Sequence, residues 1–179
     1  MSPRMPLVIL LNGPLGIGKS TLSEVLGESI ERSVALDGDQ LAGLNPPPTD
    51  EVSDLHETLA LLVAHHHAKG YLRFIINHYW ERANDIADLR DRMQSAVPGA
   101  QVHCYRLCLS EEENLRRIAR RQSARAIDET EFEDQRFAEE HALFSRAVGD
   151  ELGVPFDAGG APEALAARML AMLGLPSPA

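Results

Sequence analysis

Residues 13–20 read Gly13-Pro14-Leu15-Gly16-Ile17-Gly18-Lys19-Ser20, and Thr21 follows directly. This string fits the pattern G-x-x-x-x-G-K-[ST], whose glycines let the backbone turn its N–H groups toward a phosphate. The pattern is specific only where a strand precedes it and a helix follows it. An apolar run at residues 7–11 and apolar residues at helical spacing over 19–30 meet both conditions. We therefore predict a phosphate-binding loop over residues 13–20.

Two side chains of this loop carry chemistry of their own. Lys19 can reach the β and γ phosphates of a nucleotide as a point charge, and the Ser20 hydroxyl can coordinate the Mg²⁺ that bridges them. The backbone N–H groups lie at the positive end of the following helix, which favours an anion. The sequence therefore predicts ATP and Mg²⁺ as cofactors. The expected nucleotide-binding residues are Gly13, Pro14, Leu15, Gly16, Ile17, Gly18, Lys19, Ser20 and Thr21.

Short apolar runs and longer amphipathic stretches alternate along the rest of the chain. Connections this long between short strands indicate a parallel sheet covered by helices on both faces. The chain has 179 residues, which is the length of one domain of about 100–200 residues. Strands are predicted near residues 7–11, 33–36, 72–76, 101–109 and 154–157, and helices near 19–30, 53–69, 84–96, 111–125, 131–149 and 162–173.

Charge and hydropathy argue against several kinds of partner. The chain has 17 Lys and Arg against 27 Asp and Glu, a net charge of −10, which argues against a protein that binds polyanions by charge. Its longest apolar run, residues 7–11, is far shorter than the roughly 20 residues of a membrane span and shorter than a signal-peptide core of about 7–15 residues. We expect a cytoplasmic protein whose partners include neither nucleic acid nor a membrane.

A second polar group, Asp37-Gly38-Asp39, ends the second predicted strand. In open parallel sheets, ligands bind beyond the carboxyl ends of the strands, so these carboxylates are placed to face the phosphate loop. Two carboxylates beside a triphosphate suggest that one coordinates Mg²⁺ and that the other acts as a base. The alternative is an ordinary turn, in which Asp39 caps a helix through Gln40 and Leu41.

A third group is the arginine-rich helix after the fourth predicted strand. Arg117 and Arg121 lie four residues apart, hence on one helical face, and could grip a transferring phosphoryl group together. The planar guanidinium suits this task because it stays charged and binds phosphate oxygens in pairs. For Arg116, Arg120 and Arg125 we favour a solvated face that pairs with the acids at residues 111–113.

With these residues in place, the chain resembles the small P-loop kinases that phosphorylate metabolites: the shikimate, gluconate, adenylylsulfate and adenylate kinases and chloramphenicol phosphotransferase. The phosphate loop, residues 36–41, the arginine helix and residues 156–160 follow the order of that family. The resemblance implies the P-loop nucleoside triphosphate hydrolase fold, a three-layer α/β/α domain with five parallel strands in the order 2-3-1-4-5. It also implies a substrate-binding insertion at about residues 41–70 and a lid at about 122–135.

The same resemblance assigns roles to single residues. Asp39 matches the acid near the acceptor hydroxyl that acts as base, and Asp37 matches the acid close to the metal. Gly159 and Gly160 fall where such kinases pass backbone along the adenine. The two arginines match the pair that enters the lid. The expected catalytic residues are Lys19, Asp39, Arg117 and Arg121, and the expected metal ligands are Ser20 and Asp37.

The end of the third predicted strand departs from the family. Many relatives have an Asp there that helps to hold Mg²⁺, or a glycine cluster that binds shikimate, but this chain has Asn77-His78. The difference argues against a true shikimate kinase and leaves the metal to Ser20 and the acids after the second strand, with Asn77 orienting one of them. The expected substrate-binding residues are Asp37, Asp39, Asn77, His78, Trp80 and Arg82. For Trp80, packing in the hydrophobic core is the alternative to substrate binding.

Residues 65–67 are three consecutive histidines in a predicted helix. Successive helical residues point about 100° apart, so these three rings cannot converge on one ion. We expect no zinc site here and place the histidines in the substrate insertion.

The leading hypothesis is an ATP-dependent kinase that transfers the γ-phosphoryl group to a hydroxyl of a small molecule. The insertion has no lysine before Lys69 and no arginine before Arg73, which favours a neutral or singly charged acceptor: a sugar acid, a sugar or an antibiotic. Two alternatives stay open. A toxin-type kinase would act on a nucleotide sugar or a polynucleotide end, and a regulatory P-loop NTPase would couple nucleotide hydrolysis to a protein partner.

Overall fold

The computed structural model describes residues 5–122 and 130–176, and nothing is said of the side chains of residues 121–134. The strands are β1 Leu7–Asn12, β2 Ser33–Asp37, β3 Arg73–His78, β4 Gln101–Cys108 and β5 Val154–Asp157. The helices are α1 Lys19–Ser29, α2 Gly38–Leu41, α3 Glu51–Ala68, α4 Ala83–Ala96, α5 Glu111–Gln122, α6 Thr130–Arg146 and α7 Pro162–Met172.

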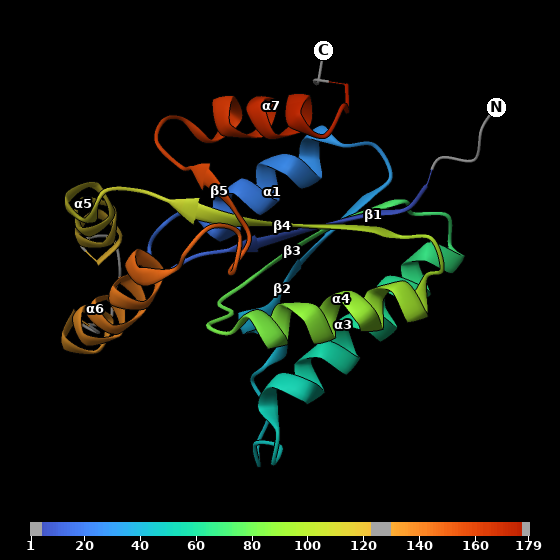
Figure 1. The fold of residues 1–179 in the computed structure, drawn as a ribbon, viewed down its shortest axis with the longest axis horizontal. Helices are drawn as coiled ribbons and strands as arrows, with labels where there is room; N and C mark the ends of the chain where they lie inside the picture. Colours follow the sequence, from blue (N-terminus) through green and yellow to red (C-terminus); the bar gives the residue numbers. More distant parts are fainter. Residues whose placement is uncertain (1–4, 123–129, 177–179) are drawn as a thin grey trace.

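All five strands are parallel and form one sheet in the order β2-β3-β1-β4-β5, which confirms the predicted fold class and strand order. Helices α1 and α7 cover one face of the sheet, and α3 and α4 cover the other (Figure 1). Helices α5 and α6 lie at the end toward which β4 points (Figure 1). The carboxyl ends of the strands therefore meet these two helices, where ligands of open parallel sheets bind.

Strand β1 is the centre of the sheet and is buried along its whole length. It pairs with β3 on one side and with β4 on the other. Val8 and Leu10 belong to the core beneath α3 and α4, whereas Ile9 and Leu11 belong to the core beneath α1 and α7. Burial on both faces explains why this strand is a continuous apolar run and not an alternating one.

Among the differences from the predicted elements, two shape the site. Strand β3 continues through Asn77 and His78, because the parallel pairing with β1 and β2 persists after the apolar pattern has ended. A short helix, α2, follows β2 directly. Asp37 caps it by accepting a hydrogen bond from the Asp39 N–H (3.0 Å), so the capping residue is Asp37 and not Asp39.

The predicted insertion and lid are described to different extents. Residues 41–70 contain α3 and the loop before it, and α3 packs with α4 in one core. Helix α5 ends at Gln122 and α6 begins at Thr130, so most of the predicted lid lies outside the described residues. Within residues 5–122 and 130–176, no helix is both long and apolar enough to cross a lipid bilayer.

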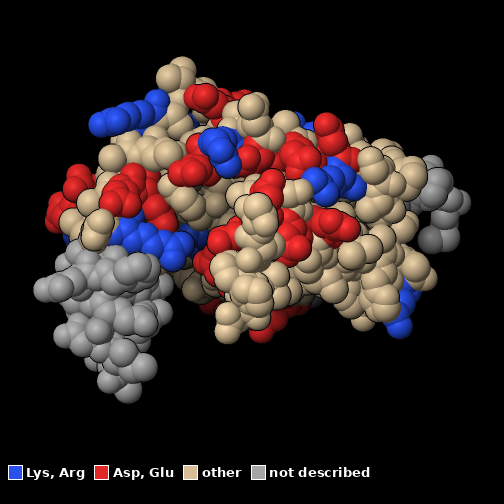
Figure 2. Space-filling view, turned by 90° about the horizontal axis from the view of Figure 1, so that it is seen from below, with Lys and Arg blue, Asp and Glu red and all other residues tan. Residues whose placement is uncertain are grey.

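The surface over α3 and α4 is dominated by acids. Acidic side chains are spread across this face, with fewer basic side chains among them (Figure 2). The distribution agrees with the net charge of −10. A polyanion approaching this face would meet repulsion.

Candidate active site

The phosphate loop connects β1 to α1 at the carboxyl end of the sheet. Gly16 and Gly18 have φ angles of 75° and 103°, a region that favours glycine. A Cβ atom on Gly16 would also lie 2.3 Å from the Cγ1 atom of Ile118. Helix α1 begins at Lys19 with Gly18 as its N-cap, so the loop includes the N–H groups of a first helical turn. This geometry suits an anion.

Asn12 braces the loop from its first residue. Its Oδ1 accepts hydrogen bonds from the N–H groups of Gly13 and Trp80 (both 2.9 Å). Its Nδ2 donates to the carbonyl oxygens of Trp80 (2.9 Å) and Leu152 (3.1 Å). The sequence analysis did not single out Asn12; the available signal was a polar residue at the end of an apolar strand.

Lys19 is turned back onto its own loop. Its Nζ donates to the carbonyl oxygens of Gly13 (2.7 Å) and Pro14 (3.1 Å). Burial lowers the pKa of Lys19 to about 8, although the charges of Glu140 and Asp39 oppose this shift. The ammonium is therefore held ready inside the loop and titrates close to neutral pH.

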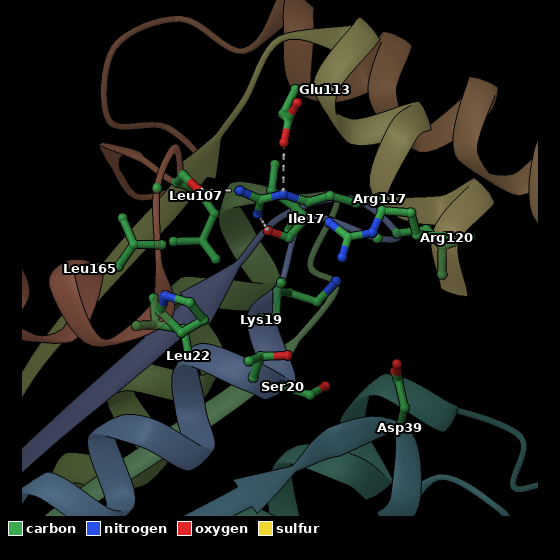
Figure 3. A pocket seen from close by; sticks show the side chains of 17 residues that line it. Ile17, Lys19, Ser20, Leu22, Asp39, Leu107, Glu113, Arg117, Arg120 and Leu165 are labelled. Carbon is green, nitrogen blue, oxygen red and sulfur yellow. Dashed lines mark hydrogen bonds and ion pairs between the residues drawn. The ribbon is translucent and has the colours of Figure 1, made fainter. Parts of the chain in front are cut away.

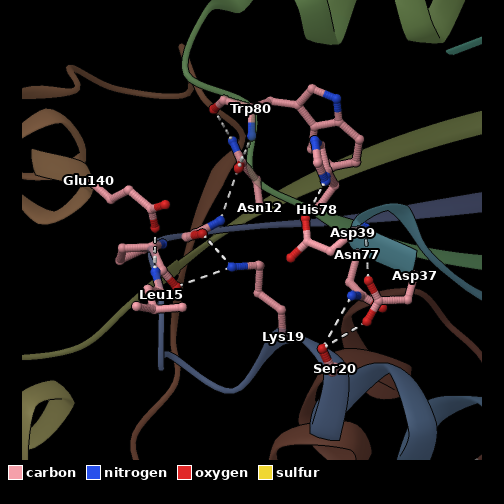
Figure 4. A network of polar contacts seen from close by, with 12 residues as sticks. Asn12, Leu15, Lys19, Ser20, Asp37, Asp39, Asn77, His78, Trp80 and Glu140 are labelled. Atoms are coloured by element: carbon pink, nitrogen blue, oxygen red, sulfur yellow. Dashed lines mark hydrogen bonds and ion pairs between the residues drawn. The ribbon is translucent and has the colours of Figure 1, made fainter. Parts of the chain in front are cut away.

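Ser20, Asp37 and Asn77 form one polar group beside Lys19 (Figure 4). The Ser20 hydroxyl donates to Asp37 Oδ2 (3.0 Å), and Asn77 Nδ2 lies 3.4 Å from the same hydroxyl oxygen as a donor. The register of β2 and β3 explains this meeting, because Asp37 pairs directly with Asn77. A hydroxyl and a carboxylate are oxygen ligands of the kind that Mg²⁺ accepts together with phosphates and water.

Asp39 and His78 form a second polar pair. His78 Nδ1 lies 2.8 Å from Asp39 Oδ1, and this contact lowers the pKa of Asp39 against the opposing effect of partial burial. Gly38 makes the approach possible, because a Cβ atom there would lie 2.9 Å from the His78 ring. The Asp39 side chain stays 54% exposed, so its carboxylate is both ionised at neutral pH and accessible.

A cavity of about 670 Å³ opens over the phosphate loop (Figure 3). Its volume lies in the range of about 300–1,000 Å³ that is usual for small-molecule sites. Gly160 lines it as expected, whereas the Gly159 N–H donates to Asp157 Oδ1 (2.9 Å). Ser20 and Thr21 also line the cavity. Outside the loop and α1, the lining residues are Asp39, Leu107, Glu113, Arg117, Arg120, Ala158, Gly160, Pro162 and Leu165.

Arg117 clamps the wall of this cavity. Its guanidinium donates to the carbonyl oxygens of Ile17 and Ala158 (both 3.0 Å) and so ties the phosphate loop to the turn between β5 and α7. Arg120, which the sequence analysis placed on a solvated face, lines the cavity as well (Figure 3). The side chain of Arg121 and the whole of Arg125 lie outside the described part of the chain.

Two expected substrate-binding residues are placed differently from the others. Trp80 is 2% exposed and packs in the core, where its Nε1 donates to His56 Nε2 (3.0 Å). Arg82 is 64% exposed and pairs with Asp85 (3.0 Å). The structure thus gathers Asp37, Asp39, Asn77 and His78 around Lys19 and Ser20. Trp80 does not line the cavity but packs edge-on behind His78, with ring centroids 5.2 Å apart, and Arg82 lies outside the group. The three histidines at 65–67 occupy the last turn of α3.

Glu140 and Arg136 reach the site from α6, and neither was predicted from the sequence. Glu140 Oε2 accepts a hydrogen bond from the Leu15 N–H (2.6 Å), and its Oε1 accepts from Arg136 Nε (2.6 Å). A Glu and an Arg four residues apart in a polar helix have the pattern of a solvated ion pair. Only the tertiary structure brings them to the phosphate loop, 125 residues away from Leu15 in the chain.

Solved structures with the same fold include a resistance protein and several kinases. The tunicamycin resistance protein of Deinococcus radiodurans superimposes with a TM-score of 0.71 at 15% identity, covering 97% of this chain and 99% of that one. A sugar kinase from Janibacter sp. HTCC2649 has a TM-score of 0.67 at 19% identity, covering 96% and 95%. A fungal RNA kinase has a TM-score of 0.62 at 11% identity, covering 97% and 86%. These superpositions show a shared fold, and at such low identities they show the fold alone.

Among curated proteins, none matches the sequence significantly. The sequence does match a protein family, the AAA domain family AAA_33, over residues 8–146. That match includes the phosphate loop, both acids after β2, the end of β3 and helices α5 and α6. The chain therefore belongs to the AAA_33 family of AAA domains, and it has the fold of the small P-loop kinases that it resembles.

Proposed function

We propose that the protein is an ATP-dependent kinase that transfers the γ-phosphoryl group to a hydroxyl of a small molecule. The observation that carries this proposal is the position of Asp39. Its accessible carboxylate lines the cavity over the phosphate loop and is held by His78 at the carboxyl end of the sheet. A hydroxyl bound beside this carboxylate would face the terminal phosphate of a nucleotide in the loop.

The phosphate loop supplies the nucleotide-binding half of the site. Its backbone N–H groups and Lys19 would hold the phosphates, with Lys19 turning from the carbonyl oxygens of Gly13 and Pro14 toward the incoming anion. The Ser20 hydroxyl and the Asp37 carboxylate fit Mg²⁺, which, when bound, neutralises charge that develops on the phosphate oxygens. Asn77 orients Ser20 through its amide group.

Asp39 acts on the acceptor in this mechanism. Its lowered pKa keeps it ionised at neutral pH, so it accepts a hydrogen bond from the acceptor hydroxyl and aims the oxygen at the γ phosphorus. The new bond joins that oxygen to phosphorus, the bond from phosphorus to the β–γ bridging oxygen breaks, and the hydroxyl proton passes to the carboxylate or to water. The main contribution of Asp39 is to align the acceptor hydroxyl, because a carboxylate with a lowered pKa is a weak base.

The charge of the acceptor side favours a neutral or singly charged compound, such as a sugar, a sugar acid or an antibiotic. Residues 41–68 contain no lysine or arginine. Among the described arginines, Arg117 and Arg120 line the cavity on the side of the phosphate loop, and Arg136, which acts on Asp39, already pairs with Glu140. The described residues on the side of Asp39 therefore favour an acceptor with no more than one negative charge.

ADP release from MgATP tests the proposal, measured with sugars, sugar acids, hydroxyl-bearing antibiotics, nucleotide sugars and a 5′-hydroxyl oligonucleotide. We expect one class of small compound to stimulate release. Asp39→Asn should lose this stimulation by about 100-fold or more while it keeps its ATP affinity. Asp91→Asn, an exposed acid of α4, is the matched control. Slow ATP hydrolysis whose rate is changed neither by any compound nor by Asp39→Asn would contradict the kinase proposal and favour a regulatory NTPase.

A further inference from the structure

Glu140 is a buried carboxylate that contacts the phosphate loop directly. Its side chain is 5% exposed, although it belongs to a helix that is otherwise mostly polar. Both of its oxygens are engaged, one by the Leu15 N–H (2.6 Å) and one by Arg136 Nε (2.6 Å). Burying a carboxylate is costly unless it has partners of this kind, so the contact is a built feature of the site.

The partner of Glu140 is a group that a phosphate-binding loop offers to its ligand. Backbone N–H groups of such a loop cradle the phosphates of the nucleotide. In this structure the N–H of Leu15 donates to Glu140, and the ammonium of Lys19 donates to carbonyl oxygens of the loop itself. Two donors of the loop thus have acceptors within the protein itself.

The charges around Lys19 point the same way. Glu140 has the largest influence on Lys19 of the three carboxylates around it, ahead of Asp39 and Asp37. Figure 4 shows the Glu140 carboxylate directed at the loop from the side of α6, with Lys19 and Asp39 nearby. A polyphosphate that enters this space brings several negative charges close to the Glu140 carboxylate. Because this carboxylate is buried, solvent and salt screen the repulsion between it and the phosphates only weakly.

We propose that Glu140 is an internal anion of the phosphate loop, with which a nucleotide polyphosphate must compete, and that it thereby sets the affinity for the nucleotide. This inference rests on the proposed function, because it assumes that the loop binds a nucleotide. The contact holds the loop through the Leu15 N–H, and losing this contact on nucleotide binding opposes binding. The repulsion between Glu140 and the nucleotide grows with the number of charged phosphates. Glu140 therefore weakens the binding of nucleotides but not the binding of the uncharged nucleoside.

Glu140→Gln is the informative variant, because the amide keeps the size of the side chain and an oxygen acceptor for the Leu15 N–H but removes the charge. Glu139→Gln is the matched control, since Glu139 is the exposed neighbour whose carboxylate accepts from Gln135. Calorimetric titration with ATP, ADP and adenosine, without acceptor, measures the effect. We expect Glu140→Gln to bind ATP about ten-fold more tightly, ADP more tightly by less, and adenosine unchanged. Glu139→Gln should match the wild type.

ATP binding by Glu140→Gln that is unchanged or weaker would overturn the inference, and so would an equal gain for adenosine. If the variant fails to fold, an experimental structure of the wild type with ADP or a nonhydrolysable ATP analogue decides instead. We expect the Leu15 N–H to have left Glu140 in that complex, and a retained hydrogen bond would overturn the inference. If neither the wild type nor the variant binds ATP, the proposed function itself fails.

Discussion

Lys19 illustrates how one residue serves both the free and the bound states. In the free protein its ammonium is desolvated and donates to two carbonyl oxygens, Gly13 O and Pro14 O. Such a lysine is partly prepared for binding, since much of its water has already been removed. The phosphates of a nucleotide would then provide the charge partner that the carbonyl oxygens only approximate.

This arrangement predicts proton uptake on nucleotide binding at alkaline pH. Burial lowers the pKa of Lys19 from 10.5 to about 8 in the free protein, and bound phosphates raise it again because they stabilise the ammonium. Below about pH 8 Lys19 is already charged. Above that pH binding must take up a proton, so ATP affinity falls by up to about ten-fold per pH unit.

Calorimetry in two buffers that differ in ionisation enthalpy measures this uptake. We expect each nucleotide to take up close to one proton at a pH midway between the pKa values of Lys19 in the free and the nucleotide-bound protein. Below pH 7 the uptake should be smaller. Lys19→Met should bind ATP more weakly and abolish this uptake. Uptake that persists in the variant would assign the proton to another group.

Trp80 gives a second prediction for a single residue. Its indole N–H is buried against His56 Nε2, and His56 Nδ1 in turn contacts Asp88 Oδ2 (2.7 Å). Trp80→Phe removes the donor, leaves the His56 acceptor unsatisfied and opens a small cavity. We expect the free energy of unfolding in urea to fall by about 2–4 kcal/mol.

Nucleotide binding and the KM for the acceptor should stay unchanged in Trp80→Phe, because the backbone groups that hold Asn12 remain and a phenyl ring still packs against His78. Trp80 was also expected from the sequence to bind the acceptor. An increase in the acceptor KM with little loss of stability would support that expectation and contradict the core role.

At the scale of elements, Arg117 connects three parts of the molecule. It projects from α5 and binds the carbonyl oxygens of Ile17 in the phosphate loop and Ala158 after β5. Arg117→Lys keeps the charge, but an ammonium lacks the fork that spans both carbonyl oxygens. We expect the free energy of unfolding to fall by about 1–3 kcal/mol and ATP to bind more weakly.

Arg116→Lys is the control for this variant. Arg116 belongs to the same helix but is exposed, where it pairs with Glu112 and Glu113, and surface pairs of this kind contribute about 0–1 kcal/mol. The sequence analysis expected Arg117 to grip the transferring phosphoryl group. A large drop in kcat with unchanged stability would favour that catalytic role over the clamp.

The elements themselves were largely predictable, because their signals are local. The apolar run at residues 7–11, the loop glycines and the crossover lengths define β1, the phosphate loop and the parallel sheet before any contact is known. The end of β3 was not predictable, since Asn77 and His78 stay in the strand through pairing with its neighbours. Glu140 was hidden for a similar reason: its partner lies in another element.

At the scale of the whole molecule, the charge distribution limits the choice of acceptor. Acids are spread over the face of α3 and α4 (Figure 2), and the insertion contains no lysine or arginine over residues 41–68. The fold alone does not impose a preference for a small acceptor, because an RNA kinase has the same fold. We therefore expect surface charge, and not topology, to decide between a small acceptor and a polynucleotide acceptor.

The corresponding prediction concerns a 5′-hydroxyl RNA oligonucleotide at low ionic strength, where electrostatic binding is strongest. With a net charge of −10, the protein should not change the fluorescence anisotropy of a labelled oligonucleotide, and an excess of that oligonucleotide should not slow phosphorylation of a small acceptor. A known polynucleotide kinase serves as the positive control for the probe. Saturable binding that weakens steeply with salt, together with transfer of phosphate from ATP to the 5′ end, would instead place a basic nucleic-acid path on the protein and make the polynucleotide the acceptor.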